Sequence, residues 1–126
     1  RIYDFDRVGA NGVGRELHVE EAVDAIDYNC YEEYKTSYDK YAHEAEIGRS
    51  QYFVTNRLQI SETTYRNYAK FDTCIILMIL EGEGELSFGN HSVSYKLGDS
   101  ILVPNEISEL NINPDKKSKL LEVKIP

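Results

Sequence analysis

Residues 72–104 constrain the fold more than any other stretch of this sequence. An unbroken apolar run over residues 74–80 is long enough for one buried strand and far shorter than the roughly 18 residues of a membrane helix. Turn sequences at 81–84, 89–90 and 98–99 then separate short alternating segments. Short strands at such even spacing are typical of an antiparallel sandwich or small barrel.

The pattern on either side extends this interpretation. Residues 52–60, 63–65, 107–112 and 120–125 read as further strands, with a turn at 113–116, because β-branched and aromatic residues dominate or apolar and polar residues alternate. Residues 16–27 differ, since Val19, Ala22, Val23 and Ile26 fall on one helical face. We therefore expect a mainly β fold with one short N-terminal helix.

Composition narrows the class of protein. With 41% hydrophobic and 29% charged residues, 126 residues suffice for one globular domain. A net charge of −8 argues against nucleic acid or an anionic membrane as partner. Cys30 and Cys74 form no disulfide framework, and we expect Cys74, inside the apolar run, to be a buried thiol in a reducing cytoplasm. Because the chain starts with Arg1, we interpret it as part of a longer protein.

The segment 29–50 gives the weakest signal. Tyrosines recur there and just before it at three- and four-residue steps, at positions 28, 31, 34, 38 and 41. That spacing is helical, and the segment is interpreted as a tyrosine face packed on the sheet, a loosely ordered connection between two parts of a larger protein, or an aromatic platform for a sugar or peptide; spacing alone does not separate the three.

The order of strands and glycine turns resembles the cupin family, a small double-stranded β-barrel or jelly roll. The family's motifs have the forms G-x5-H-x-H-x3–4-E-x6-G and G-x5-P-x-G-x2-H-x3-N. Gly82 stands at the closing glycine of the first motif, and Gly98 with Pro104 gives the G-x5-P of the second. The resemblance implies a cupin-like barrel over residues 51–126.

The metal ligands of those motifs are missing. Ile75 stands at the glutamate position, Glu109 at the second-motif histidine and Glu106 at its second glycine. The histidine pair falls at apolar, aromatic or cationic residues, namely Ala69 and Phe71, or Tyr68 and Lys70. A metal site of this kind needs about three imidazoles and a carboxylate, and an apolar or cationic substitute offers no lone pair to a metal ion, so we expect no metal site in this barrel.

The remaining candidates are weak. His18, His43 and His91 fall on three separate expected segments without ligand spacing, so we interpret them as surface residues. Glu106 and Glu109 are interpreted as barrel-rim residues rather than a catalytic pair.

The first 28 residues carry a second resemblance. Residues 1–7, RIYDFDR, a Gly/Asn loop, and then Arg15-Glu16-Leu17-His18 leading into the expected helix resemble a stretch of the type I mannose-6-phosphate isomerases in their short bacterial form. In that family a cupin-like barrel follows and contains a segment similar to residues 97–104. Residues 1–28 then correspond to the end of the catalytic region, 29–50 to a linker that can be helical, and 51–126 to a metal-free barrel.

This resemblance implies a function. The family interconverts mannose 6-phosphate and fructose 6-phosphate through a cis-enediol, with zinc as Lewis acid. The zinc ligands of the full-length enzyme lie upstream in the family, so this piece alone is expected to be structural and inactive, with no cofactor of its own. Arg1 aligns with an arginine that assists proton transfer, and Arg7 with a basic position suited to the substrate phosphate.

Two other readings stay open. One is a stand-alone, metal-free cupin that binds or senses a small sugar, with tyrosines at the barrel mouth. The other is a purely structural interaction module. The sequence indicates neither the oligomeric state nor the exact sugar.

Overall fold

The computed structural model describes residues 1–126 and divides them into two compact units, Arg1–Tyr34 and Lys35–Pro126. The first unit holds the only helix, α1 (Val19–Asp24), and an isolated bridge between Val8 and Gly14. The helix is shorter than the expected 16–27 and none of its residues is buried. No helix of the structure has the length and apolarity that a membrane crossing requires.

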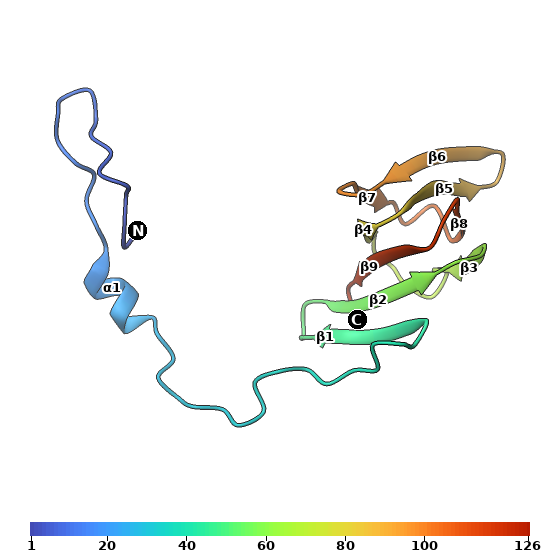
Figure 1. Ribbon diagram of the computed structural model, residues 1–126, viewed down its shortest axis with the longest axis horizontal. Coiled ribbons are helices and arrows are strands. Elements are labelled where there is room, and N and C mark those ends of the chain that lie inside the picture. The colour runs from blue at the N-terminus through green and yellow to red at the C-terminus, as the bar shows by residue number, and fades with distance from the viewer. The chain divides into compact units, whose positions relative to one another are not determined.

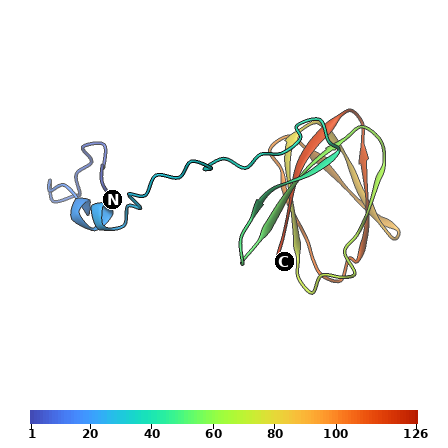
Figure 2. The ribbon, with the colours of Figure 1, turned by 90° about the horizontal axis from the view of Figure 1, so that it is seen from below.

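The second unit consists of nine strands in two antiparallel sheets (Figure 1). The strands are β1 (Glu44–Arg49), β2 (Val54–Ile60), β3 (Thr64–Asn67), β4 (Ile75–Glu81), β5 (Glu83–Phe88), β6 (His91–Lys96), β7 (Ser100–Val103), β8 (Glu109–Pro114) and β9 (Ser118–Lys124). One sheet has the order β1-β2-β9-β4-β7 and the other β3-β8-β5-β6. Figure 2 shows these strands surrounding a common interior. The mainly β, jelly-roll expectation is confirmed.

The core fills the space between the sheets. Its most buried members come from β2, β4, β8 and β9, and Leu77, Ile112 and Leu120 are fully inaccessible to solvent. Alternation along β4 explains this packing, because Ile75, Leu77 and Ile79 are buried and the residues between them are exposed.

Two glycines shape the turns of the barrel. Gly82 has φ +89° and Gly98 φ +91°, the left-handed region that glycine occupies without strain. A Cβ at Gly82 would also lie 2.8 Å from the carbonyl oxygen of Lys117 and against Ser118, whereas nothing lies within 4 Å of one at Gly98.

Three expectations are wrong in detail. Residues 44–49 belong to the segment 29–50, which is interpreted from the sequence as a linker that can be helical. They instead form β1, because their backbone pairs with β2. Residues 113–114 belong to β8 rather than to a turn, because Pro114 pairs with Gly84 at the sheet's end. Cys74 is exposed, since it precedes the first residue of β4, Ile75, instead of lying within the strand.

Arg57 holds the segment that precedes β1 against the barrel. Arg57 on β2 is only 6% exposed. Its guanidinium donates to the carbonyl oxygens of Asp39 (3.1 Å), Lys40 (3.2 Å) and Ala42 (2.8 Å), and it lies 5.6 Å from the ring centroid of Tyr38. Residues 38–42 therefore follow the barrel surface.

Candidate functional site

The two arginines singled out in the sequence lie in the first unit. The Arg1 guanidinium donates to the carbonyl oxygen of Glu16 at 3.0 Å and lies 3.8 Å from the Asp4 carboxylate. The Arg7 guanidinium carbon is 5.9 Å from the ring centroid of Phe5. Each is thus placed against its own segment, and their roles in catalysis and phosphate binding stay predictions.

A third arginine holds this segment together. Arg15 pairs with the Asp4 carboxylate through two nitrogens, and the hydrogen bonds and charge of Arg15 hold the pKa of Asp4 below its usual value. The pair joins residues eleven positions apart, so it closes the loop between them. Sequence reasoning counted Arg15 within the family-like stretch but assigned it no partner.

The barrel positions that match cupin ligands are structural. Ile75 is 1% exposed and belongs to the core, so the position of the family's glutamate holds a packing residue. Glu106 and Glu109 are both exposed. His18, His43 and His91 are also exposed and lie beside α1, before β1 and on β6.

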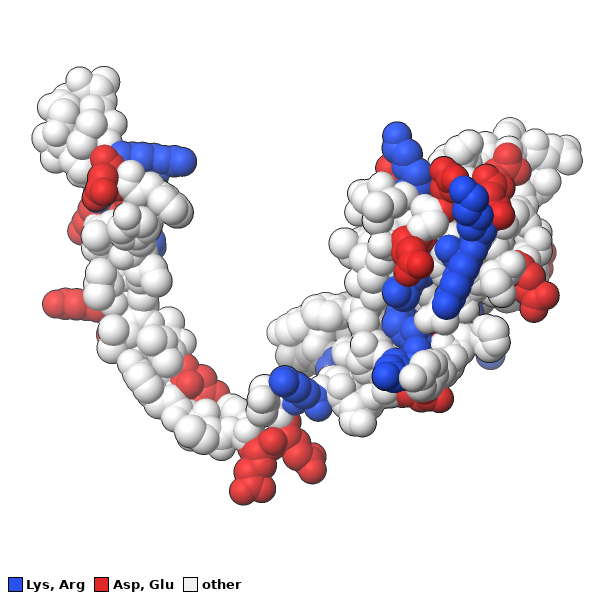
Figure 3. All heavy atoms as spheres, viewed as in Figure 1, with Lys and Arg blue, Asp and Glu red and all other residues white.

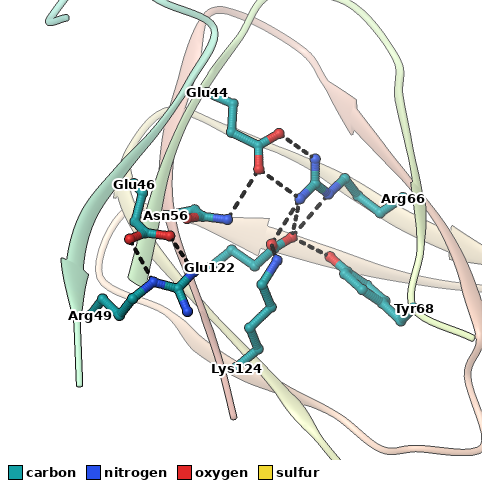
Figure 4. Close-up of polar contacts among 8 residues, drawn as sticks. All are labelled: Glu44, Glu46, Arg49, Asn56, Arg66, Tyr68, Glu122 and Lys124. Carbon is teal, nitrogen blue, oxygen red and sulfur yellow. Dashed lines mark hydrogen bonds and ion pairs between the residues drawn. The ribbon is translucent and has the colours of Figure 1, made fainter. Parts of the chain in front are cut away.

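The polar centre of the barrel lies instead around Glu122 on β9, whose side chain is fully buried (Figure 4). Arg66 of β3 donates to both Glu122 oxygens, from Nε at 2.9 Å and from Nη2 at 2.8 Å. The Tyr68 hydroxyl donates to Glu122 Oε2 at 2.8 Å, and Lys124 Nζ to Oε1 at 3.2 Å. We call these four residues, together with Glu44, the Glu122 network.

Glu44 extends the Glu122 network to the edge strand β1. Its carboxylate accepts from Arg66 Nη1 at 2.9 Å and Nη2 at 3.2 Å, and from the amide of Asn56 at 3.1 Å. Arg66 therefore bridges two carboxylates and ties β3 of one sheet to β1 and β9 of the other.

The network shifts several pKa values. Burial alone raises the pKa of Glu122, but the hydrogen bonds and charge of Arg66, with Tyr68 and Lys124, outweigh it and leave that pKa lowered. Burial and the adjacent Glu122 carboxylate raise the pKa of Tyr68. Glu122 is thus an anion and Tyr68 a neutral donor throughout the physiological range.

The donor set does not fit a zinc ion. Both carboxylates of the Glu122 network are already neutralised by Arg66 and Lys124, and the network contains no imidazole or thiolate. Elsewhere, too, no group of three or more histidine, cysteine, aspartate or glutamate side chains is arranged to hold a metal ion. The ion pairs of the network therefore connect the two sheets to each other.

Charge on the second unit is not evenly spread. Figure 3 shows basic side chains gathered in a band across the face turned to the viewer, where Figure 1 draws β9, β2 and β1. This contrasts with the net charge of −8 for the whole chain.

Comparison with known proteins gives the family. The mannose-6-phosphate isomerase cupin domain matches residues 44–118. Mannose-6-phosphate isomerase ManA of Bacillus subtilis is 25% identical over 115 residues, which cover 89% of this chain and 36% of ManA. The mannose-6-phosphate isomerase of Streptococcus mutans is 23% identical over 117 residues, 91% of this chain and 36% of that enzyme. The chain thus spans 36% of the length of these relatives.

Solved structures agree on the fold. The crystal structure of the mannose 6-phosphate isomerase from Bacillus subtilis matches with a TM-score of 0.74 at 24% identity, covering 99% of this chain and 40% of that one. A cupin-2 domain protein from Shewanella frigidimarina matches with a TM-score of 0.56 at 11% identity, covering 87% and 94%. The first match covers the family-like N-terminal stretch as well as the barrel, and the second shows the jelly roll in a protein about as long as this chain. By its barrel sequence and its fold, this chain belongs to the mannose-6-phosphate isomerase cupin-domain family.

Proposed function

We propose that this chain is the C-terminal, barrel-bearing part of a cytoplasmic mannose-6-phosphate isomerase of carbohydrate metabolism. The observation that carries the proposal is the family match over residues 44–118, together with relatives named as that enzyme which align over 89% of the chain. The whole enzyme would interconvert mannose 6-phosphate and fructose 6-phosphate by proton transfer through a cis-enediol. Zinc would supply Lewis-acid chemistry from a part of the enzyme outside these 126 residues.

Within that enzyme the barrel would have a structural role. Its interior is filled by apolar side chains and by the Glu122 network, whose charges are internally compensated. A filled, charge-balanced interior leaves no group free to move a proton at a substrate. The chain alone is therefore expected to show no isomerase turnover in the presence of zinc and mannose 6-phosphate.

A chimera tests the proposal. In ManA of Bacillus subtilis, the aligned 36% of the enzyme is replaced by this chain, and fructose 6-phosphate formation is measured. We expect the chimera to be active and the chain alone to be inactive. An inactive but folded chimera, or zinc-dependent turnover by the chain alone, would contradict the proposal.

The same chimera tests the two arginines. If Arg1 acts on the enediol, Arg1→Lys lowers kcat with little change in KM, because the charge stays but the bidentate geometry is lost. If Arg7 holds the phosphate, Arg7→Gln raises KM more than it lowers kcat. Lys117→Gln removes a charge from the β8–β9 turn and serves as the control. Unchanged kinetics for both arginine variants would remove these roles.

A further inference from the structure

A groove of about 500 Å³ opens beside the Glu122 network, on the side of β3 and the loop that follows it. It is lined by Tyr65, Arg66, Asn67, Tyr68, Lys70, Phe71 and Lys124. Its volume lies within the roughly 300–1,000 Å³ typical of small-molecule sites. We call it the β3 groove.

The lining of the β3 groove is cationic. Three of its residues, Arg66, Lys70 and Lys124, carry positive charge and none is acidic. Two carboxylates contact these cations: Glu122, which is fully buried and accepts hydrogen bonds from Arg66 and Lys124, and Glu44, which accepts from Arg66. Arg66 and Lys124 are paired with Glu122 and Glu44, so Lys70 leaves the groove with an excess of one positive charge, in a chain whose net charge is −8.

Hydrogen-bond donors remain free in the groove. Arg66 uses four of its five N–H groups on Glu122 and Glu44, which leaves one. Lys124 donates once to Glu122 and keeps two donors, and its ammonium is held 4.8 Å from the ring centroid of Phe71. Lys70, which is exposed, adds a flexible third cation at the rim.

Aromatic rings line the same groove. Phe71 is partly buried against the core and Tyr65 is half exposed on β3. Tyr65 alternates with Arg66 along β3, and its hydroxyl is engaged by Glu109, which raises the pKa of Tyr65, so Phe71 is the ring on the cationic side of the groove. Convergent cations beside aromatic faces suit a ligand that combines an anionic group with a ring.

We propose that the β3 groove binds a phosphate monoester of a monosaccharide, with the phosphate at Lys70, Lys124 and Arg66 and the sugar ring against Phe71. The phosphate half of this ligand follows from the charges and free donors of the groove. The choice of a sugar as the other half rests on the proposed function. All residues of the proposed site belong to the barrel unit.

Binding to the chain as it stands tests the proposal. Mannose 6-phosphate, inorganic phosphate and unphosphorylated mannose are titrated at low salt, and amide shifts are followed by NMR. We expect saturable binding of mannose 6-phosphate with Kd of about 1 mM or below. The shifts should be confined to residues 65–71 and 124, with weaker binding of phosphate and none of mannose.

Charge reversal at the rim supplies the matched pair of variants. Lys70→Glu should weaken mannose 6-phosphate binding about fivefold or more, because it places a carboxylate beside the phosphate. Lys117→Glu makes the same change seven residues before Lys124, about 23 Å away along β9, and should leave Kd within about twofold. Lys124→Gln, a change without charge reversal, should also weaken binding.

Several outcomes would overturn the inference. The first is that mannose 6-phosphate shows no saturable binding below about 10 mM. The second is that Lys70→Glu and Lys117→Glu change its Kd equally, and the third is that inorganic phosphate binds as tightly as the sugar phosphate. Binding of unphosphorylated mannose would likewise contradict it and favour a sugar-sensing barrel. Activity of the ManA chimera is a separate readout, so the groove and the proposed function can fail independently.

Discussion

Removing the charge of Glu122 should destabilise the barrel more than any other conservative carboxylate substitution. In Glu122→Gln the side chain keeps its volume and one acceptor, but Arg66 and Lys124 lose their common counter-ion while remaining only 16% exposed. Breaking a buried ion pair from one side costs about 3–5 kcal/mol. Arg66 keeps its bonds to Glu44, so we expect the lower end, about 3 kcal/mol.

Urea unfolding measures this change. The chain has ten tyrosines and no tryptophan, so tyrosine fluorescence and far-UV circular dichroism report the transition. The expected loss is a large fraction of the roughly 5–15 kcal/mol of a typical domain, and it should appear as a lower midpoint at constant m-value.

A matched control makes the test specific. Glu46→Gln is the same chemical change in an exposed pair with Arg49, and its midpoint should stay almost unchanged. A Glu122→Leu, Arg66→Met double variant should recover most of the loss, because it removes the uncompensated charge and leaves apolar groups. Equal effects of Glu122→Gln and Glu46→Gln would refute the reasoning that burial of the network sets its energetic weight.

Three further outcomes are expected. Contacts lower the pKa of Glu122 in the folded state, so its contribution to the free energy of unfolding is fully present above its unfolded pKa near 4.5 and is lost as pH falls below that value. The free energy of unfolding should therefore depend less on acid pH in Glu122→Gln than in the wild type. Gly98→Ala should lower the free energy of unfolding by about 1–2 kcal/mol, because of its positive φ alone. Gly82→Ala should lower it by at least about 2 kcal/mol more, because its Cβ would clash with the β8–β9 turn. Similar urea midpoints for the two variants would contradict the clash. Cys30 and Cys74 are both exposed, so a thiol reagent should modify two groups in the native protein, and protection of Cys74 would disprove its exposure.

Periodicity and turn chemistry predicted most of the barrel. The apolar run at 74–80 became the buried strand β4, and Gly82 and Gly98 occupy turns with positive φ, as the family-like spacing indicated. These features are local, since a strand's alternation and a glycine's φ depend on few neighbours. β1 was missed because a sequence such as Glu44–Arg49, with two glutamates and a glycine, carries little strand preference and is fixed by pairing with β2.

The Glu122 network was missed for a different reason. Between Leu121 and Ile125 apolar and charged residues alternate, which ordinarily indicates that Glu122 and Lys124 face solvent. In the structure the face that carries Glu122 is the buried one, because Glu122 alternates in step with the buried residues Ser118 and Leu120. The partners Arg66 and Tyr68 lie 56 and 54 positions before Glu122, so no local pattern could reveal them.

The position of β9 has a consequence for how this domain is made. The final strand of the sequence lies between β2 and β4, and it pairs Lys124 with Val54 across seventy positions. While the polypeptide is being synthesised, one edge of β2 and one edge of β4 therefore stay unpaired until β9 emerges. Such long-range closure is slow and leaves the nascent chain open to aggregation. Loss of β9 alone would be expected to prevent folding of the domain, because β9 lies in the middle of its sheet rather than at an edge.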